Sequence, residues 1–334
     1  TNLNTAVADV NIGGNFILAG IISIRSGSHG FVNFIGSSAV DFANTGSISG
    51  PLGINVGASA SVNFGTSIFS GTGSLIVSGT IQLGSLDAAG AYQSGATGGN
   101  IRNTGSRTFN TGSSIAYNGS GAQIIGVHPS VAGLTINNSS GVSLTGNLTI
   151  SGDMTFQSGT LVLGAFTLSL SGNVNTVAGN IQSSASSNLS IVGTGTFNSL
   201  AFAAAPATIG SFVLNRTGIV AALSSDLTVA TGLTLSSNSV LNISNHSLTI
   251  SGTYSASSAA RIASSSTSNL TVNGAGAVGV FRFRTGNSSL NNWTINKPSS
   301  TITLGTALSL FGTLTIQSTS TTFAAGSALS LQST

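Results

Sequence analysis

Short apolar–polar–apolar triplets recur along most of the chain. They are clearest between residues 134 and 170, in the pairs Leu134/Ile136, Val142/Leu144, Leu148/Ile150, Met154/Phe156, Leu161/Leu163 and Leu168/Leu170. Alternation with a period of two is typical of β-strands, and Gly, Ser and Asn fill the gaps between pairs as turns require. Three such strands occupy roughly 20 residues, which is the size of one three-sided turn of a parallel β-solenoid.

We therefore predict an all-β protein, a right-handed parallel β-solenoid with about 17 coils of about 20 residues each. Helix is disfavoured because Glu, Lys, Gln and Met are almost missing from the sequence, and these residues are strong helix formers. The alternative is a set of β-sandwich repeats, whose strands are also separated by frequent turns. Strands of a sandwich usually run about five or six residues, and the strands expected here are shorter and more evenly spaced.

A longer repeat is superimposed on this pattern. The strings LGIN, LTIN, FVLN and WTIN stand at positions 52–55, 134–137, 212–215 and 293–296, and their spacing is nearly constant. We interpret residues 1–51 as an N-terminal cap or assembly segment and residues 52–334 as a β-solenoid. The solenoid divides into four super-repeats of about 80 residues, at 52–133, 134–211, 212–292 and, in part, 293–334.

The repeated strings also suggest roles for their residues. Their first position exchanges large apolar side chains in phase, which is typical of a core; it is held by Leu52, Leu134, Phe212 and Trp293. Their last position is always Asn, which we expect to cap a turn or to satisfy backbone groups at a corner; it is held by Asn55, Asn137, Asn215 and Asn296. A glycan contact is the alternative reading of these asparagines.

Charged residues are scarce and scattered. They make up 4% of the chain, with a net charge of +3, against about 25% in a typical soluble domain. No two of the five Asp and three His lie close together in the sequence, and Cys is absent. General acid–base catalysis needs paired titratable groups, so we expect no enzyme, no catalytic residue, no metal site and no cofactor. The eight cations are too dispersed to bind nucleic acid.

The most apolar stretch lies near the start of the chain, at positions 16–24, with the sequence FILAGIISI. It is much shorter than a transmembrane helix, which needs about 20 residues, so no membrane span is expected. Six apolar side chains of this stretch are candidates for an assembly surface: Phe16, Ile17, Leu18, Ile21, Ile22 and Ile24.

The segments YNGSGAQ (117–123) and GLTINNSSGVSLTGNLTISGDMTFQSGTLVLGAFTLSLSG (133–172) resemble the long low-charge repeat regions of secreted and cell-surface proteins of Bacteroidetes-type bacteria. The resemblance covers roughly residues 115–334 and is more compositional than motif-exact. It implies a β-solenoid in an extracellular setting, in an adhesin or a surface fibre. It carries over no catalytic residue, because the residues shared by the family are structural.

Together these patterns favour an extracellular structural protein at the cell surface, a subunit of a surface fibre, filament or cell coat. Its expected partner is a second copy of itself, joined head to tail through β edges and solenoid ends. An adhesin stalk, or a module that binds surface glycans or ice, is the alternative, although regular threonine columns are not evident in the sequence. A polysaccharide-degrading enzyme is disfavoured, because it would need carboxylates that converge on one face.

Overall fold

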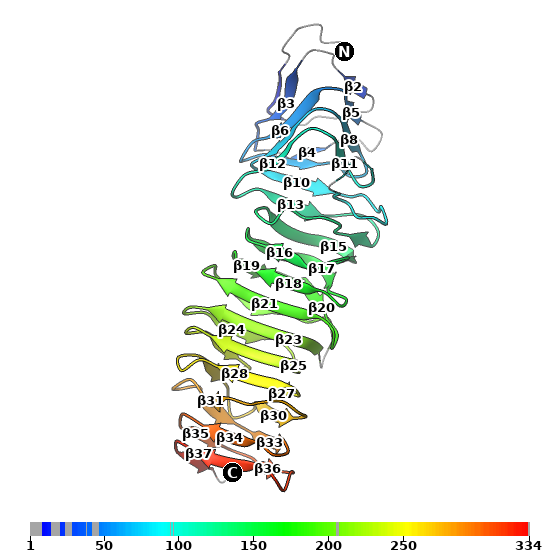
Figure 1. The fold of residues 1–334 in the computed structure, drawn as a ribbon. Helices are drawn as coiled ribbons and strands as arrows, with labels where there is room; N and C mark the ends of the chain where they lie inside the picture. Colours follow the sequence, from blue (N-terminus) through cyan, green and yellow to red (C-terminus); the bar gives the residue numbers. More distant parts are fainter. Residues whose placement is uncertain are drawn as a thin grey trace. The chain divides into compact units, whose positions relative to one another are not determined.

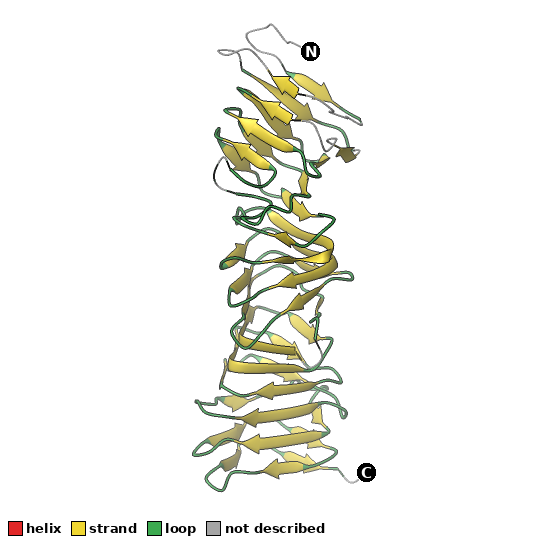
Figure 2. Cartoon of the chain, turned by 90° about the vertical axis from the view of Figure 1, so that its right-hand side faces the viewer, coloured by secondary structure: helices red, strands yellow, loops and turns green. Residues whose placement is uncertain are grey.

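The computed structural model describes residues 9–14, 21–23, 29–37, 39–41, 47–93, 95, 97–204 and 207–332. Within these ranges the regular structure is all strand (Figure 2), and no helix exists that could cross a membrane. The named strands pair in parallel, turn upon turn, in a β-solenoid of about 14 turns that lie about 21 residues apart. The prediction of a parallel β-solenoid is confirmed, and the β-sandwich alternative is wrong.

The described turns are fewer than expected, because several of them are longer than the sequence pattern predicts. The turn that leads from Phe69 to its paired residue Ile101 is the most enlarged, since it carries the loop 84–100. The turn from Leu189 to its partner Phe212 is also extended. Variable loops at the corners leave the strand ladder intact, because the ladder hydrogen bonds join the strand segments of successive turns.

The chain forms two compact units, residues 1–162 with 177–179, and residues 163–176 with 180–334. The first unit contains three parallel sheets (Figure 1). One sheet has the strand order β1 (Val10–Ile12), β3 (Gly30–Phe34), β6 (Leu52–Val56), β9 (Leu75–Val77) and β12 (Arg107–Phe109). The second sheet contains β4 (Ala39–Asp41), β7 (Ser61–Asn63), β10 (Thr80–Leu83), β13 (Ser114–Tyr117), β15 (Gly133–Ser143) and β17 (Met154–Val162), and β14 (Gln123–Ile124) pairs with β15. The last has β2 (Ile21–Ser23), β5 (Ser47–Ser49), β8 (Ile68–Gly71) and β11 (Ile101–Asn103), and β16 (Leu148–Ile150) also belongs to this unit.

The second unit is built in the same way (Figure 1). Its longest sheet contains β18 (Thr167–Leu170), β21 (Asn188–Gly193), β23 (Ala207–Arg216), β25 (Leu227–Ser236), β27 (Ser247–Ile250), β30 (Asn269–Asn273), β33 (Asn292–Asn296) and β36 (Leu314–Ile316), with β28 (Thr253–Ala256) beside β25. A second sheet contains β22 (Ser199–Leu200), β24 (Val220–Leu223), β26 (Val240–Asn242) and β29 (Arg261–Ala263). Two three-stranded sheets follow. The first contains β31 (Val280–Phe281), β34 (Thr301–Leu304) and β37 (Thr322–Ala325), and the second contains β32 (Ser289–Leu290), β35 (Leu308–Leu310) and β38 (Leu329–Leu331). Strands β19 (Val174–Thr176) and β20 (Asn180–Gln182) also belong to this unit.

The apolar positions of the triplets form the core. Every residue of the six pairs between Leu134 and Leu170 is buried, because alternate side chains of each strand point inward. Aromatic rings fill the core of the second unit around Trp293. The ring centroids of Phe281, Phe283 and Phe323 lie 5.5, 6.1 and 5.4 Å from that of Trp293, all in edge-on geometry.

The described part of residues 1–51 shares the architecture of the turns that follow. Strand β3 pairs in parallel with β6 across residue 51, and β1 pairs with β3. The division between the two compact units falls near residue 162. Among the assembly candidates, Ile21 and Ile22 lie in β2, whereas Phe16, Ile17, Leu18 and Ile24 lie outside the described residues.

Candidate functional site

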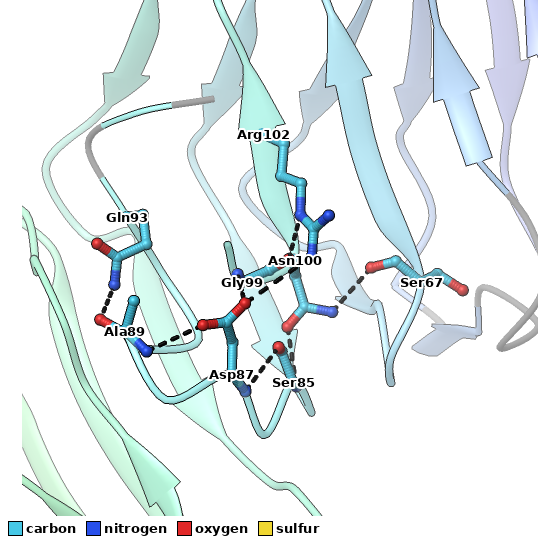
Figure 3. Close-up of polar contacts among 8 residues, drawn as sticks. All are labelled: Ser67, Ser85, Asp87, Ala89, Gln93, Gly99, Asn100 and Arg102. Carbon is cyan, nitrogen blue, oxygen red and sulfur yellow. Dashed lines mark hydrogen bonds and ion pairs between the residues drawn. The ribbon is translucent and has the colours of Figure 1, made fainter. Parts of the chain in front are cut away.

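The loop of residues 84–100, between β10 and β11, brings a carboxylate and a guanidinium together (Figure 3). Asp87 Oδ1 accepts a hydrogen bond from the backbone N–H of Ala89 at 2.9 Å, and Oδ2 accepts one from the N–H of Gly99 at 3.2 Å. The Nη2 atom of Arg102, in β11, lies 3.9 Å from Asp87 Oδ2. One carboxylate therefore joins the two ends of the loop.

A buried amide fastens the same loop to the preceding turn (Figure 3). The Nδ2 atom of Asn100 donates to the carbonyl oxygens of Gly65 and Ser67, both at 2.8 Å. The Oδ1 atom of Asn100 accepts from the backbone N–H of Ser85 at 3.0 Å. Since a buried amide is costly when unpaired, these three bonds fix where the loop begins and ends.

The electrostatics of this cluster favour a loop-ordering role. Hydrogen bonds from the N–H groups of Ala89 and Gly99 lower the pKa of Asp87, and the charge of Arg102 acts in the same direction, against an opposing effect of desolvation. A carboxyl group with a lowered pKa is ionised near neutral pH and is a poor proton donor there. Both of its oxygens are also engaged by the loop itself. The geometry accounts for a carboxylate that holds the two ends of the loop together.

Other described carboxylates likewise join neighbouring parts of the solenoid. Asp9 accepts from the N–H of Phe31 at 2.8 Å, Asp41 from the side-chain amide of Asn63 at 2.9 Å, and Asp226 from the N–H of Ser247 at 2.8 Å. Asp226 also lies 3.6 Å from Nδ1 of His246. In the part of the chain that the structure describes, no group of three or more His and Asp side chains is placed to hold a metal ion.

Two cations are completely buried among backbone carbonyl groups. Arg216, at the end of β23, has no exposed surface. Its guanidinium donates to the carbonyl oxygens of Val192 (2.7 Å), Gly195 (2.8 Å), Thr196 (3.1 Å), Leu170 (3.2 Å) and Gly172 (2.7 Å). These carbonyls belong to the two preceding turns. The side chain therefore reaches back and joins three successive turns.

Lys297, one long repeat further along the chain, joins its own turn to the turns before it in the same way. It is also fully buried, and its Nζ atom donates to the carbonyl oxygens of Gly252, Asn273 (3.1 Å) and Ala275 (3.0 Å). Gly252 and Asn273 correspond to Gly172 and Val192 in the long repeat. Burial lowers the pKa of both cations. We refer to these two arrangements, Arg216 with its five carbonyls and Lys297 with its three, as carbonyl cages.

The sequence did not reveal the carbonyl cages. Both cations directly follow the repeated asparagine, Arg216 after Asn215 and Lys297 after Asn296. An isolated basic residue is usually exposed to solvent, so composition alone assigned them no role. The signal that could have found them is their position, since a residue one step from an outward-facing asparagine faces inward on a strand.

The structure places the predicted repeat residues as follows. Leu52, Leu134, Phe212 and Trp293 are all buried in the core. The asparagines lie in strands. Three of them bond to a side chain of a neighbouring turn: Asn55 to Asn33 (3.1 Å), Asn137 to Ser158 (2.9 Å) and Asn215 to Ser237 (2.7 Å). Asn296 is the exposed last residue of β33. The four asparagines point outward because each stands one residue after an inward-facing position.

A threonine column, not evident in the sequence, runs along the longest sheet of the second unit. It contains one residue from each of six successive turns, Thr208, Thr228, Thr249, Thr271, Thr294 and Thr315, paired in register. The sequence distance from one threonine to the next lengthens at each turn as far as Thr294 and then shortens again at Thr315. Because the distance changes at every turn, a search at one fixed period does not align these residues.

Comparison of the chain with models of protein families, with curated proteins and with solved structures finds no match.

Proposed function

We propose that this protein is an extracellular structural protein that assembles with copies of itself, end to end, into a surface fibre or coat. The observation that carries the proposal is the set of strand edges at the two ends of the described solenoid. At one end the outermost strands of three parallel sheets are β1, β2 and β4; at the other they are β36, β37 and β38. Within the described residues, these strands have a neighbour on one side only.

The two sets of edges are suited to each other. Each set presents three strands that run parallel to the turns behind them, so a second copy could continue all three ladders at once. An edge strand tends to pair with another chain unless charge, Pro or a covering element blocks it. A contact between two different ends of the same chain is heterologous, and it gives a filament when it does not close into a ring.

Apolar side chains are exposed at the C-terminal set of edges. Leu331 in β38 is 68% exposed and Ile316 in β36 is 44% exposed. Residues 299–334 contain no charged residue and no Pro. A scarcity of charge disfavours colloidal stability of a free monomer and is compatible with a surface that is covered in an assembly. The extracellular setting is supported by the resemblance to secreted low-charge repeat proteins.

The test places charges at the C-terminal edges. We expect the unmodified chain to form longer species as its concentration rises in sedimentation velocity, and the double variant Ile316→Lys/Leu331→Lys to remain monomeric. The matched control is Leu86→Lys, because Leu86 is 50% exposed but lies in the loop after β10; it should assemble like the parent. Assembly that is equal in the double variant and the parent would refute the end-to-end contact, as would a parent that stays monomeric at high concentration.

A further inference from the structure

A groove of about 470 Å³ lies on the outer face of the longest sheet of the second unit. It runs across the strands β27, β30, β33 and β36, between two columns of polar side chains (strands labelled in Figure 1). One column contains Ser247, Asn269 and Asn292; the other contains Thr271, Thr294 and Thr315 from the threonine column. Since neighbouring turns are about 4.8 Å apart, the groove presents the same kinds of group at a regular spacing along its length.

The two columns differ in how their hydrogen-bonding groups are used. The Asn292 amide donates to Asn269 Oδ1 at 3.0 Å, Asn269 donates to Ser247 Oγ at 3.3 Å, and Asn292 Oδ1 accepts from the N–H of Thr313 at 2.9 Å. The first column is therefore held rigid by its own bonds. In the described part of the chain, the hydroxyls of Thr271, Thr294 and Thr315 have no hydrogen-bond partner and remain free to bind a ligand.

The chemistry of the groove selects a neutral ligand. None of the side chains that line it is charged, so it offers nothing to attract a polyanion such as nucleic acid. A threonine hydroxyl both donates and accepts, which matches the hydroxyl groups of sugars. The adjoining methyl groups add apolar contact at the same spacing.

We propose that this groove binds a linear neutral polysaccharide, which lies along the column and meets one threonine per turn. The linear shape follows from the groove, which is elongated across successive turns, and from its repeated groups. Each contact is weak, and affinity comes from several contacts made by one chain. Ice is the competing ligand for a row of threonines. The experiment below distinguishes the two ligands.

Strand β36 contributes both to the groove and to the C-terminal edges, but the groove variant changes only outward-facing side chains and the assembly variant changes Ile316 and Leu331, so the two proposals are tested separately. The experiment measures depletion of the full chain from solution by microcrystalline cellulose, by chitin and by insoluble mannan. The test variant is Thr271→Val/Thr294→Val/Thr315→Val, which removes three hydroxyls and keeps a β-branched side chain suited to a strand. The control variant is Thr234→Val/Thr301→Val/Thr303→Val, which makes the same chemical change on strands β25 and β34, outside the groove.

We expect the parent and the control variant to bind at least one of the three polymers equally. The groove variant should bind that polymer at least roughly tenfold more weakly. Circular dichroism spectra that match those of the parent establish that the groove variant is folded. The proposal is overturned if the parent binds none of the three polymers, or if the groove and control variants bind equally. Ice-recrystallisation inhibition that is lost only in the groove variant, without polysaccharide binding, would assign the surface to ice and also overturn the proposal.

Discussion

Replacing Arg216 by Met should open the first carbonyl cage. Met is also long and flexible, so it fills much of the same volume, but it has no hydrogen-bond donor. Of the five carbonyls, that of Thr196 also accepts from the N–H of Val174 at 2.8 Å. The turn carbonyls of Gly172 and Gly195 have the guanidinium as their partner.

The cost follows from these two carbonyls. A buried polar group left without its partner costs about 1–3 kcal/mol, so two of them cost about 4 kcal/mol. Removing a buried charge recovers part of this, because desolvation of the guanidinium is itself unfavourable. We therefore expect Arg216→Met to lower the free energy of unfolding by about 3 kcal/mol. Arg216→Lys should cost only about 1 kcal/mol, because Lys297 shows that an ammonium fits the equivalent cage.

The assay is urea denaturation followed by circular dichroism, with hydrogen exchange of the amides in residues 170–196. Hydrogen exchange is informative because each turn of a solenoid contacts only its neighbours. The loss of stability, and hence of amide protection, should therefore be local. Arg261→Met is the matched control. Arg261 is only half-buried and bonds to the nearby carbonyls of Ser258 and Ala260, so its loss should cost below about 1 kcal/mol. If Arg216→Met were as stable as Arg261→Met, the cage would have no structural role.

Three further predictions concern buried side chains. Trp293→Asp should unfold or open the C-terminal turns, because it buries an unpaired charge. Thr294→Asp, on the outer face, should lower the melting temperature only slightly, and thermal melting curves of the two variants test this. Tyr254 Oη is buried without a hydrogen-bond partner among the described residues, so Tyr254→Phe should stabilise by about 1 kcal/mol, measured by its urea midpoint; a lower midpoint would contradict this. Burial lowers the pKa of His128 to about 4, below the value of about 6.5 in the unfolded chain. Between these two pKa values the unfolded state therefore binds more protons than the folded state. A contribution to stability on the order of 3 kcal/mol is present above a pH of about 6.5. It is lost as the pH falls toward the folded-state pKa of about 4. His128→Gln should flatten that part of the curve of stability against pH, and an unchanged curve would contradict the assignment.

The fold could be predicted because the strand pattern is local. An inward-facing residue at every second position, as in Leu148 and Ile150, is visible in any short window of sequence. The low charge and the frequent small turn residues agree with the same architecture. The length of each turn could not be predicted, because a corner loop such as residues 84–100 extends without disturbing the ladder.

The threonine column and the carbonyl partners of the two buried cations were not predicted from the sequence, for a related reason. The threonine column depends on which residues of successive turns pair, and the sequence distance between neighbours varies from turn to turn between Thr208 and Thr315. The cage of Arg216 depends on carbonyl groups, which every residue carries and which leave no mark in the sequence. The role of Asn55 depends likewise on Asn33, in the turn before it.

Electron cryo-microscopy of the unmodified chain at high concentration tests the proposed assembly most directly. The end-to-end contact predicts filaments in which strands lie across the axis, with a spacing of about 4.8 Å that continues without a break from β36, β37 and β38 of one copy to β1, β4 and β2 of the next. Single monomers at every concentration, or filaments joined through another surface, would contradict it.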